Sequence, residues 1–140
     1  MAGNYGANQY RQTQVKTANR GQLLILLYEA AIKNVKKASD CLDKKDLNGK
    51  GAAIIKTHDI INELVNTLDF NVGGNIARDL ERLYNFMIEQ LVKANAENNK
   101  QPLVGVIKLL ENLLDGWRGA IAQVNKAQAG GTGTPTGTIK

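Results

Sequence analysis

The chain has 140 residues, of which 43% are hydrophobic and 22% charged, and this length and balance fit one globular domain with its own core. Its formal net charge is +5, but the basic residues are interleaved with acidic ones, which argues against a nucleic-acid-binding protein. A single cysteine excludes an internal disulfide, and no apolar run is long enough for a membrane-spanning helix. With no secretory signal pattern at the N-terminus, we expect a cytoplasmic protein without membrane insertion.

The two ends of the chain differ in composition from its middle. Residues 1–16 are polar and rich in Gly, Asn and Gln, yet they include Tyr10 and Val15, so we expect a partly ordered arm. Residues 127–140 contain a Gly/Thr-rich run that cannot bury enough surface to order itself, and we expect a flexible tail. The folded domain is expected over residues 17–126.

The first predicted helix runs from about Asn19 to about Lys44. Asn19 is a suitable N-cap, and Gln22 stands three residues later at the capping-box position. The second half of this helix is amphipathic, whereas its first two turns are apolar on nearly all sides and need a cover from the arm or a partner. At helical spacing, one face is shared by Leu24, Leu27, Tyr28, Ala31, Val35, Ala38 and Leu42.

The second predicted helix begins within residues 46–51 and continues to about Asp69, and Val72-Gly73-Gly74 is expected to end the element. Its apolar arc covers roughly 160°, against the ~100° that a helix on a globular core needs. This arc is lined by Ile54, His58, Ile60, Ile61, Leu64, Val65 and Leu68.

A third helix is expected from about Gly74 or Asn75 to Ala96, and a fourth from Pro102, which suits a first helical turn, to about Val124. The third places Phe86 opposite its core stripe, and the fourth again has an apolar arc of roughly 160°. The core stripe of the third comprises Ile76, Leu80, Leu83, Tyr84, Met87, Ile88, Leu91 and Ala94. Short connections between the four predict an all-α, antiparallel up-down four-helix bundle.

The sequence contains few groups that could carry chemistry. Its one histidine, His58, and one cysteine, Cys41, lie on different predicted helices, and neither has neighbours at the spacing of a metal site or a nucleophile. Gly73-Gly74 lacks the Lys-Ser/Thr and the preceding strand of a phosphate loop. We therefore expect no enzyme activity, no metal and no cofactor. Spare apolar surface without reactive groups is typical of a protein that holds another chain.

Four blocks of the sequence occur in the order and register of one known family. They are Tyr10 with Val15–Ala18 and Gln22–Ile32, then Ile60–Asp69, then Gly74–Ala77 with the apolar residues after it, and the Leu-rich segment that ends at Trp117. Over residues 10–124 the chain resembles the flagellar secretion chaperone FliS. It departs from the family pattern at Arg20, where Pro is common, at Ala30, where Gly is common, and at Gly116.

The resemblance implies a cytoplasmic chaperone that binds the C-terminal region of flagellin, prevents its premature polymerisation and aids its delivery to the flagellar type III secretion apparatus. It also implies the export-gate protein FlhA as a candidate partner. The arm is expected to act as a lid that the client displaces. By match to the family and by position, the client-binding residues are expected to be Tyr10, Ile25, Tyr28, Ile61, Leu64, Val65, Leu68 and Trp117.

Two other interpretations stay open at this point. A helical-bundle interaction module would self-associate into a homodimer, or bind an unrelated amphipathic helix, through the same apolar surface. Nucleic-acid binding through the positive charge would show a steep loss of affinity with salt, because counterions are released from phosphate. Apolar contacts with a client would be far less sensitive to salt.

Overall fold

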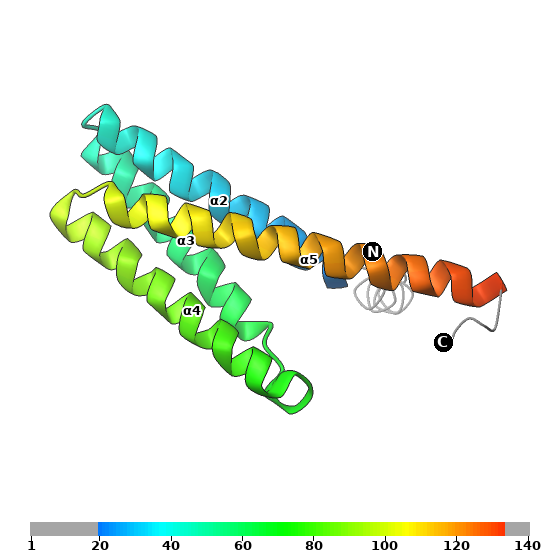
Figure 1. Ribbon diagram of the computed structural model, residues 1–140. Helices are drawn as coiled ribbons and strands as arrows, with labels where there is room; N and C mark the ends of the chain where they lie inside the picture. Colours follow the sequence, from blue (N-terminus) through cyan, green and yellow to red (C-terminus); the bar gives the residue numbers. More distant parts are fainter. Residues whose placement is uncertain (1–19, 134–140) are drawn as a thin grey trace, which may run out of the picture. The chain divides into compact units, whose positions relative to one another are not determined.

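The computed structural model describes residues 20–133 of the chain. Its helices, in chain order, are α2 (Arg20–Asp43), α3 (Leu47–Asn66), α4 (Phe70–Glu97) and α5 (Gln101–Gly133), as Figure 1 shows. The described chain divides into two compact units: Leu26–Asn112 forms the helical bundle, and the segments before and after it form the other unit. The predicted all-α helical bundle is confirmed.

Contacts between the helices of the bundle fix their directions. The Lys36 ammonium on α2 pairs with the Glu111 carboxylate on α5 at 3.2 Å, and Lys100, just before α5, pairs with Asp43 at the end of α2 at 3.0 Å. Residue numbers thus rise along α2 while they fall along α5, as antiparallel neighbours require. Both ion pairs are half exposed and contribute only about 0–1 kcal/mol each, so the apolar core must supply most of the stability.

The core takes one apolar stripe from each helix, at the 3–4-residue spacing that places side chains on one face. Burying a large aliphatic side chain fully contributes about 1.5–3 kcal/mol relative to leaving it exposed. The buried apolar residues of the bundle include Tyr28, Ala31, Val35 and Ala38 of α2, Ala53, Ile54, Ile61 and Leu64 of α3, Ala77, Leu80, Tyr84, Met87, Leu91 and Ala94 of α4, and Leu103, Val106 and Leu110 of α5.

Two polar residues that periodicity did not assign to the core are buried on α3. The Thr57 hydroxyl donates to the Ala53 carbonyl at 2.8 Å, which satisfies it within its own helix. The Lys50 ammonium donates to the Asn95 carbonyl at 3.0 Å and to the Asn98 side-chain oxygen at 2.7 Å. This cation lies at the C-terminus of α4, where the helix dipole favours positive charge, and it ties the start of α3 to the end of α4.

Helix α3 begins at Leu47 because Asp46 caps it. The Asp46 carboxylate accepts a hydrogen bond from the Gly49 backbone N–H at 3.0 Å. A β-carbon at Gly49 would overlap that carboxylate and lie 2.8 Å from the Sγ of buried Cys41. Glycine is therefore favoured at this position, and Cys41 serves as a small buried apolar group.

Helix α4 begins one turn earlier than the sequence indicates. Helix α3 ends at Asn66 rather than near Asp69, and the Asp69 carboxylate caps α4 by accepting from two first-turn N–H groups at 3.0 and 3.1 Å. Gly74 has φ 52° and ψ −121°, a conformation open to glycine, so the chain kinks there within α4. The expectation that Val72-Gly73-Gly74 ends the second helix is wrong, because Asp69 starts a new helix first.

The kink also changes which residue starts the buried stripe of α4. Ile76, expected in the core, is 68% exposed, whereas Ala77 is buried. Because adjacent helical positions differ by about 100°, only one of the two can point inward, and the helix after Gly74 turns Ala77 toward the core. The inclusion of Ile76 in the core stripe is therefore wrong.

Helix α5 continues through residues 127–133, seven residues into the segment assigned to the tail by composition. The alanines at 127 and 129 favour helix, which accounts for part of this extension. The remaining tail residues, 134–140, and the arm, 1–16, lie outside the described residues. Within residues 20–133, none of the helices combines the length and apolar character needed to cross a membrane.

The cap at the start of α3 gives a paired test on two glycines. We expect Gly49→Ala to lower the free energy of unfolding by about 1–2 kcal/mol, because the new methyl displaces the Asp46 cap. Gly51→Ala is the control: its β-carbon meets nothing closer than the Asn95 side-chain oxygen at 4.0 Å, so it should stabilise the helix by up to ~1 kcal/mol. Urea unfolding of both variants measures the difference, and shifts of the same sign would contradict this view of the cap.

Candidate functional site

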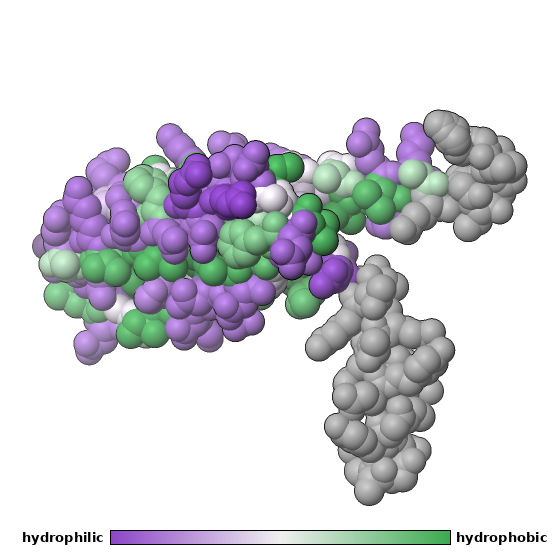
Figure 2. All heavy atoms as spheres, turned by 90° about the horizontal axis from the view of Figure 1, so that it is seen from below, coloured by the Kyte–Doolittle hydropathy of each residue, from purple (hydrophilic) through white to green (hydrophobic). Residues whose placement is uncertain are grey.

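The bundle leaves large apolar side chains exposed although its core is complete. Figure 2 shows that, on the face where α4 lies, apolar residues gather in a band between hydrophilic margins. Single exposed apolar residues are common on soluble proteins, but a band of them indicates a contact surface. Within the bundle the exposed large apolar residues include Leu26, Leu47, Ile55, Phe70, Val72, Ile76, Phe86 and Val92.

A groove of about 410 Å³ lies between α4 and α5, close to the connection that joins them. Phe86, 47% exposed, stands on its α4 side, and half-buried Leu109 stands on its α5 side. Gly105 leaves α5 open at this point, because a β-carbon there would meet no atom within 4 Å. This α4–α5 groove is lined by Phe86, Gln90, Lys93, Asn99, Gln101, Pro102, Gly105 and Leu109.

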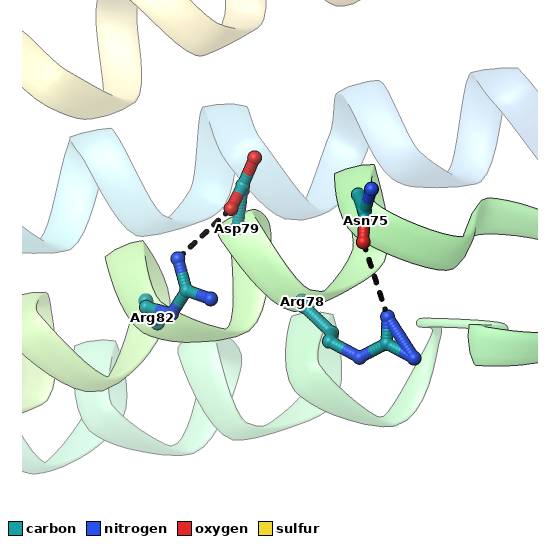
Figure 3. A network of polar contacts seen from close by, with 4 residues as sticks. All are labelled: Asn75, Arg78, Asp79 and Arg82. Carbon is teal, nitrogen blue, oxygen red and sulfur yellow. Dashed lines mark hydrogen bonds and ion pairs between the residues drawn. The ribbon is translucent and has the colours of Figure 1, made fainter.

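The charged groups along α4 differ in how they are engaged. Figure 3 shows Arg82 pointing to Asp79, with an N–O distance of 3.0 Å, and Arg78 pointing to Asn75 at 3.3 Å. Each arginine is thus engaged by the residue three positions before it on the same helix. Lys93, which lines the α4–α5 groove, has no ion pair within the described part of the chain. It is the cation of this helix that a ligand in the groove would meet.

Three of the residues expected to bind the client lie inside the bundle. Tyr28, Ile61 and Leu64 each have 0% of their surface exposed. They sit at the centre of the stripes of α2 and α3, and periodicity alone did not show that the neighbouring helices cover these centres completely. In this conformation they support the surface from within and do not present themselves to a partner.

The other expected residues lie at helix edges or outside the described chain. Val65 and Leu68 are half-buried at the end of α3, within the bundle. Ile25 and Trp117 are half-buried in the other unit, and Tyr10 lies outside the described residues. Of the eight residues, three are therefore buried, four keep part of their surface, and one lies outside the described residues.

The α4–α5 groove holds residues that the expected site lacks. Phe86 carries a signal in the sequence, because it is an aromatic residue on the polar side of its helix. Lys93, Gly105 and Leu109 carry none, since a lysine, a glycine and an edge leucine in a helix are ordinary, and only the approach of α5 to α4 makes them neighbours.

The Tyr28 and Tyr84 hydroxyls form a hydrogen bond of 2.6 Å inside the core, between α2 and α4. Their rings are tilted by 60° with centroids 6.4 Å apart, an arrangement favoured by aromatic pairs. Burial raises the pKa of the Tyr84 phenol well above its ordinary value, and the neighbouring Tyr28 raises it further. The pair is a neutral polar contact that fixes how α2 and α4 meet, because a shifted register would break this buried hydrogen bond.

The family model for the flagellar protein FliS matches residues 2–124 of the chain. The chain belongs to the FliS family. It is 33% identical over 118 residues to the flagellar secretion chaperone FliS of Campylobacter jejuni, covering 84% of this chain and 92% of that protein. It is 31% identical over 124 residues to the protein of the same name from Bacillus subtilis, covering 89% and 92%.

A solved structure described as a flagellar chaperone from bacteria has the same fold. Its TM-score to the present structure is 0.73 at 23% identity, with 85% of this chain and 97% of that chain covered. Together with the family match, this makes the chain a flagellar export chaperone built as a helical bundle. FliS is a family of chaperones and not of enzymes, which confirms the expectation from the sequence.

The side chains that line the α4–α5 groove suit the binding of another polypeptide chain. Among the described residues, no three His, Cys, Asp or Glu side chains approach closely enough to hold a metal ion. What the α4–α5 groove does offer is an aromatic side chain, an aliphatic one and one cation, which are groups for binding a polypeptide.

The buried tyrosine pair makes stability depend on alkaline pH. In the unfolded chain Tyr84 ionises near a pKa of about 10, whereas in the folded chain its raised pKa keeps it neutral. The contribution of the neutral Tyr84 phenol to the free energy of unfolding is therefore complete below pH ~10. It is lost as the pH rises above that value, at up to ~1.4 kcal/mol per pH unit. We expect Tyr84→Phe to cost about 1 kcal/mol at pH 7 and to make the alkaline loss shallower. Urea titrations at pH 7 and pH 11 measure the free energy of unfolding of both chains. If the variant and the wild type lose the same stability between these pH values, Tyr84 is not the source of the alkaline loss.

Proposed function

We propose that this FliS-family chaperone works in the cytoplasm, where it binds the C-terminal region of flagellin, prevents its premature polymerisation and aids its delivery to the flagellar type III secretion apparatus. The observation that carries the proposal is the band of exposed apolar residues on a bundle whose core is already complete. The export-gate protein FlhA is proposed as a further partner, to which the loaded chaperone presents its client.

The proposed client needs the kind of cover that this surface supplies. The flagellin C-terminal segment forms helix in the filament, so it is an amphipathic chain whose apolar side must be shielded before assembly. Exposed apolar side chains along α3 and α4 can pack against such a helix as it lies across the bundle. A segment that folds as it binds loses about 2–5 kcal/mol in ordering, which limits the affinity and permits release at the export apparatus.

Within the expected site, the half-buried residues are the ones we propose as direct contacts. Val65 and Leu68 present part of their surface at the end of α3, and Ile25 and Trp117 do so in the other unit. Buried Tyr28, Ile61 and Leu64 would act through packing alone. We retain the proposal that the arm with Tyr10 covers apolar surface until the client replaces it.

The alternative is a bundle that self-associates through the same apolar surface. Titrating a flagellin C-terminal peptide into the full chain in a calorimeter, with sedimentation of the chain alone, distinguishes the two. We expect binding near 1:1 stoichiometry, an affinity that changes little between 50 and 300 mM salt, and delayed flagellin polymerisation. Concentration-dependent dimerisation without peptide binding would support the alternative, and a steep salt dependence would indicate a charge-driven ligand such as nucleic acid.

A pair of adjacent positions on α3 tests the proposed contacts. Val65→Asp places a charge on the half-buried edge, whereas Asn66→Asp places the same charge on a neighbouring exposed position. We expect Val65→Asp to weaken peptide binding by about tenfold or more, which is about 1.4 kcal/mol, and Asn66→Asp to change it by less than about twofold. Thermal unfolding must show both variants folded at the assay temperature. Equal affinities for a folded Val65→Asp and the control would remove Val65 from the contact surface.

A further inference from the structure

We propose that the α4–α5 groove is a subsite that takes one apolar side chain of the flagellin C-terminal segment together with a carboxylate one helical turn away on the same segment. The inference rests on the proposed function and adds the chemistry that this groove selects. It is carried by the groove's shape, its apolar walls and the charge of its rim.

The walls and the opening of the groove suit an inserted apolar side chain. Phe86 and Leu109 face the space from α4 and α5, and buried Pro102 in the first turn of α5 also lines it. Gly105 is exposed inside helix α5, where glycine costs about 0.5–1 kcal/mol relative to alanine. No neighbour within the bundle requires a glycine there, since a β-carbon would meet open space. The missing side chain instead allows another chain to approach α5 closely.

The rim of the groove is electropositive and rich in donors. Lys93 has no ion pair among the described residues, and none of the eight lining residues is acidic. The Asn99 side-chain oxygen accepts from the Gln101 N–H at 3.0 Å, which leaves the Asn99 amide N–H groups as donors toward a ligand. The complement of such a rim is a carboxylate, and the chain's formal charge of +5 favours an acidic partner in the same sense.

An amphipathic helix presents both required groups with one geometry. Side chains three or four positions apart on a helix lie about 5–6 Å from each other, so an apolar anchor between Phe86 and Leu109 places an acidic neighbour near Lys93. The apolar anchor supplies affinity, and the lysine selects helices that carry an acid at the right spacing. A segment without that acid would bind more weakly and with less preference for one register.

The first arm of the test fills the groove. Gly105→Leu adds a large side chain inside it, and Gly119→Leu, on the same helix and also facing open space, is the matched control outside it. Both changes raise helix propensity, so neither should unfold the chain. With a flagellin C-terminal peptide in the calorimeter, we expect Gly105→Leu to weaken binding by about tenfold or more and Gly119→Leu by less than about twofold.

The second arm tests the carboxylate. Lys93→Gln removes the rim cation, and Lys108→Gln removes an exposed cation of α5 that does not line the groove. Each is titrated with the peptide and with the same peptide carrying Asn and Gln in place of every Asp and Glu. We expect Lys93→Gln to weaken the acidic peptide by about threefold to fivefold and to leave the amide peptide unchanged, while Lys108→Gln shows no such difference.

The outcomes separate the subsite from the proposed function. If the peptide binds the wild-type chain, Gly105→Leu and Gly119→Leu with equal affinity, the subsite is overturned and the proposed chaperone function stands. If Lys93→Gln weakens the binding of both peptides equally, the proposed pairing of Lys93 with a carboxylate of the client is overturned. Absence of binding to the wild-type chain would overturn the proposed function, and the subsite with it.

Discussion

A four-helix core can bury only one stripe of each helix, and α4 carries apolar side chains outside its stripe. Tyr84 and Met87 fill the inward positions, and Phe86, about 100° away from Met87 on the helix, cannot turn inward without removing it. The exposure of Phe86 therefore follows from the helical period and not from loose packing. Because of this constraint, α4 keeps exposed apolar side chains although the inward positions of the core are already filled.

The same arrangement lets the bundle offer apolar surface without losing its own stability. Polar contacts inside the bundle hold its register: the Tyr28–Tyr84 hydrogen bond sets how α2 meets α4, and Lys50 holds the start of α3 against the end of α4. Neither contact involves the residues that line the α4–α5 groove. A partner can thus occupy the groove while the core stays as it is, which is what a chaperone that later releases its client requires.

Much of the fold could be predicted from apolar spacing and caps. The helical periodicity identified the stripes of α2 and α4 and the outward position of Phe86, because side-chain direction depends on residue number alone. It could not place Ile76, since the kink at Gly74 depends on where Asp69 caps α4. It also could not find Lys50, whose burial depends on Asn95 and Asn98 at the C-terminal end of α4.

The candidate site was harder to predict for the same reason. Periodicity gives the breadth of an apolar arc but not which part of it a neighbouring helix covers. Ile61 and Leu64 lie in the arc of α3 and are fully buried, whereas Val65 in the same arc keeps part of its surface. The α4–α5 groove exists only because the two helices bring Phe86 and Leu109 together across a connection of three residues.

Photocrosslinking tests the central claim most directly. Benzoylphenylalanine in place of Phe86 keeps an aromatic group in the α4–α5 groove, whereas the same group in place of Lys37 is exposed on α2, which does not line the groove. After irradiation with flagellin, we expect a covalent complex through position 86, mapped by mass spectrometry to the flagellin C-terminal segment, and little through position 37. Crosslinking through position 37 but not 86, or to other parts of flagellin only, would contradict the proposed contact in the groove.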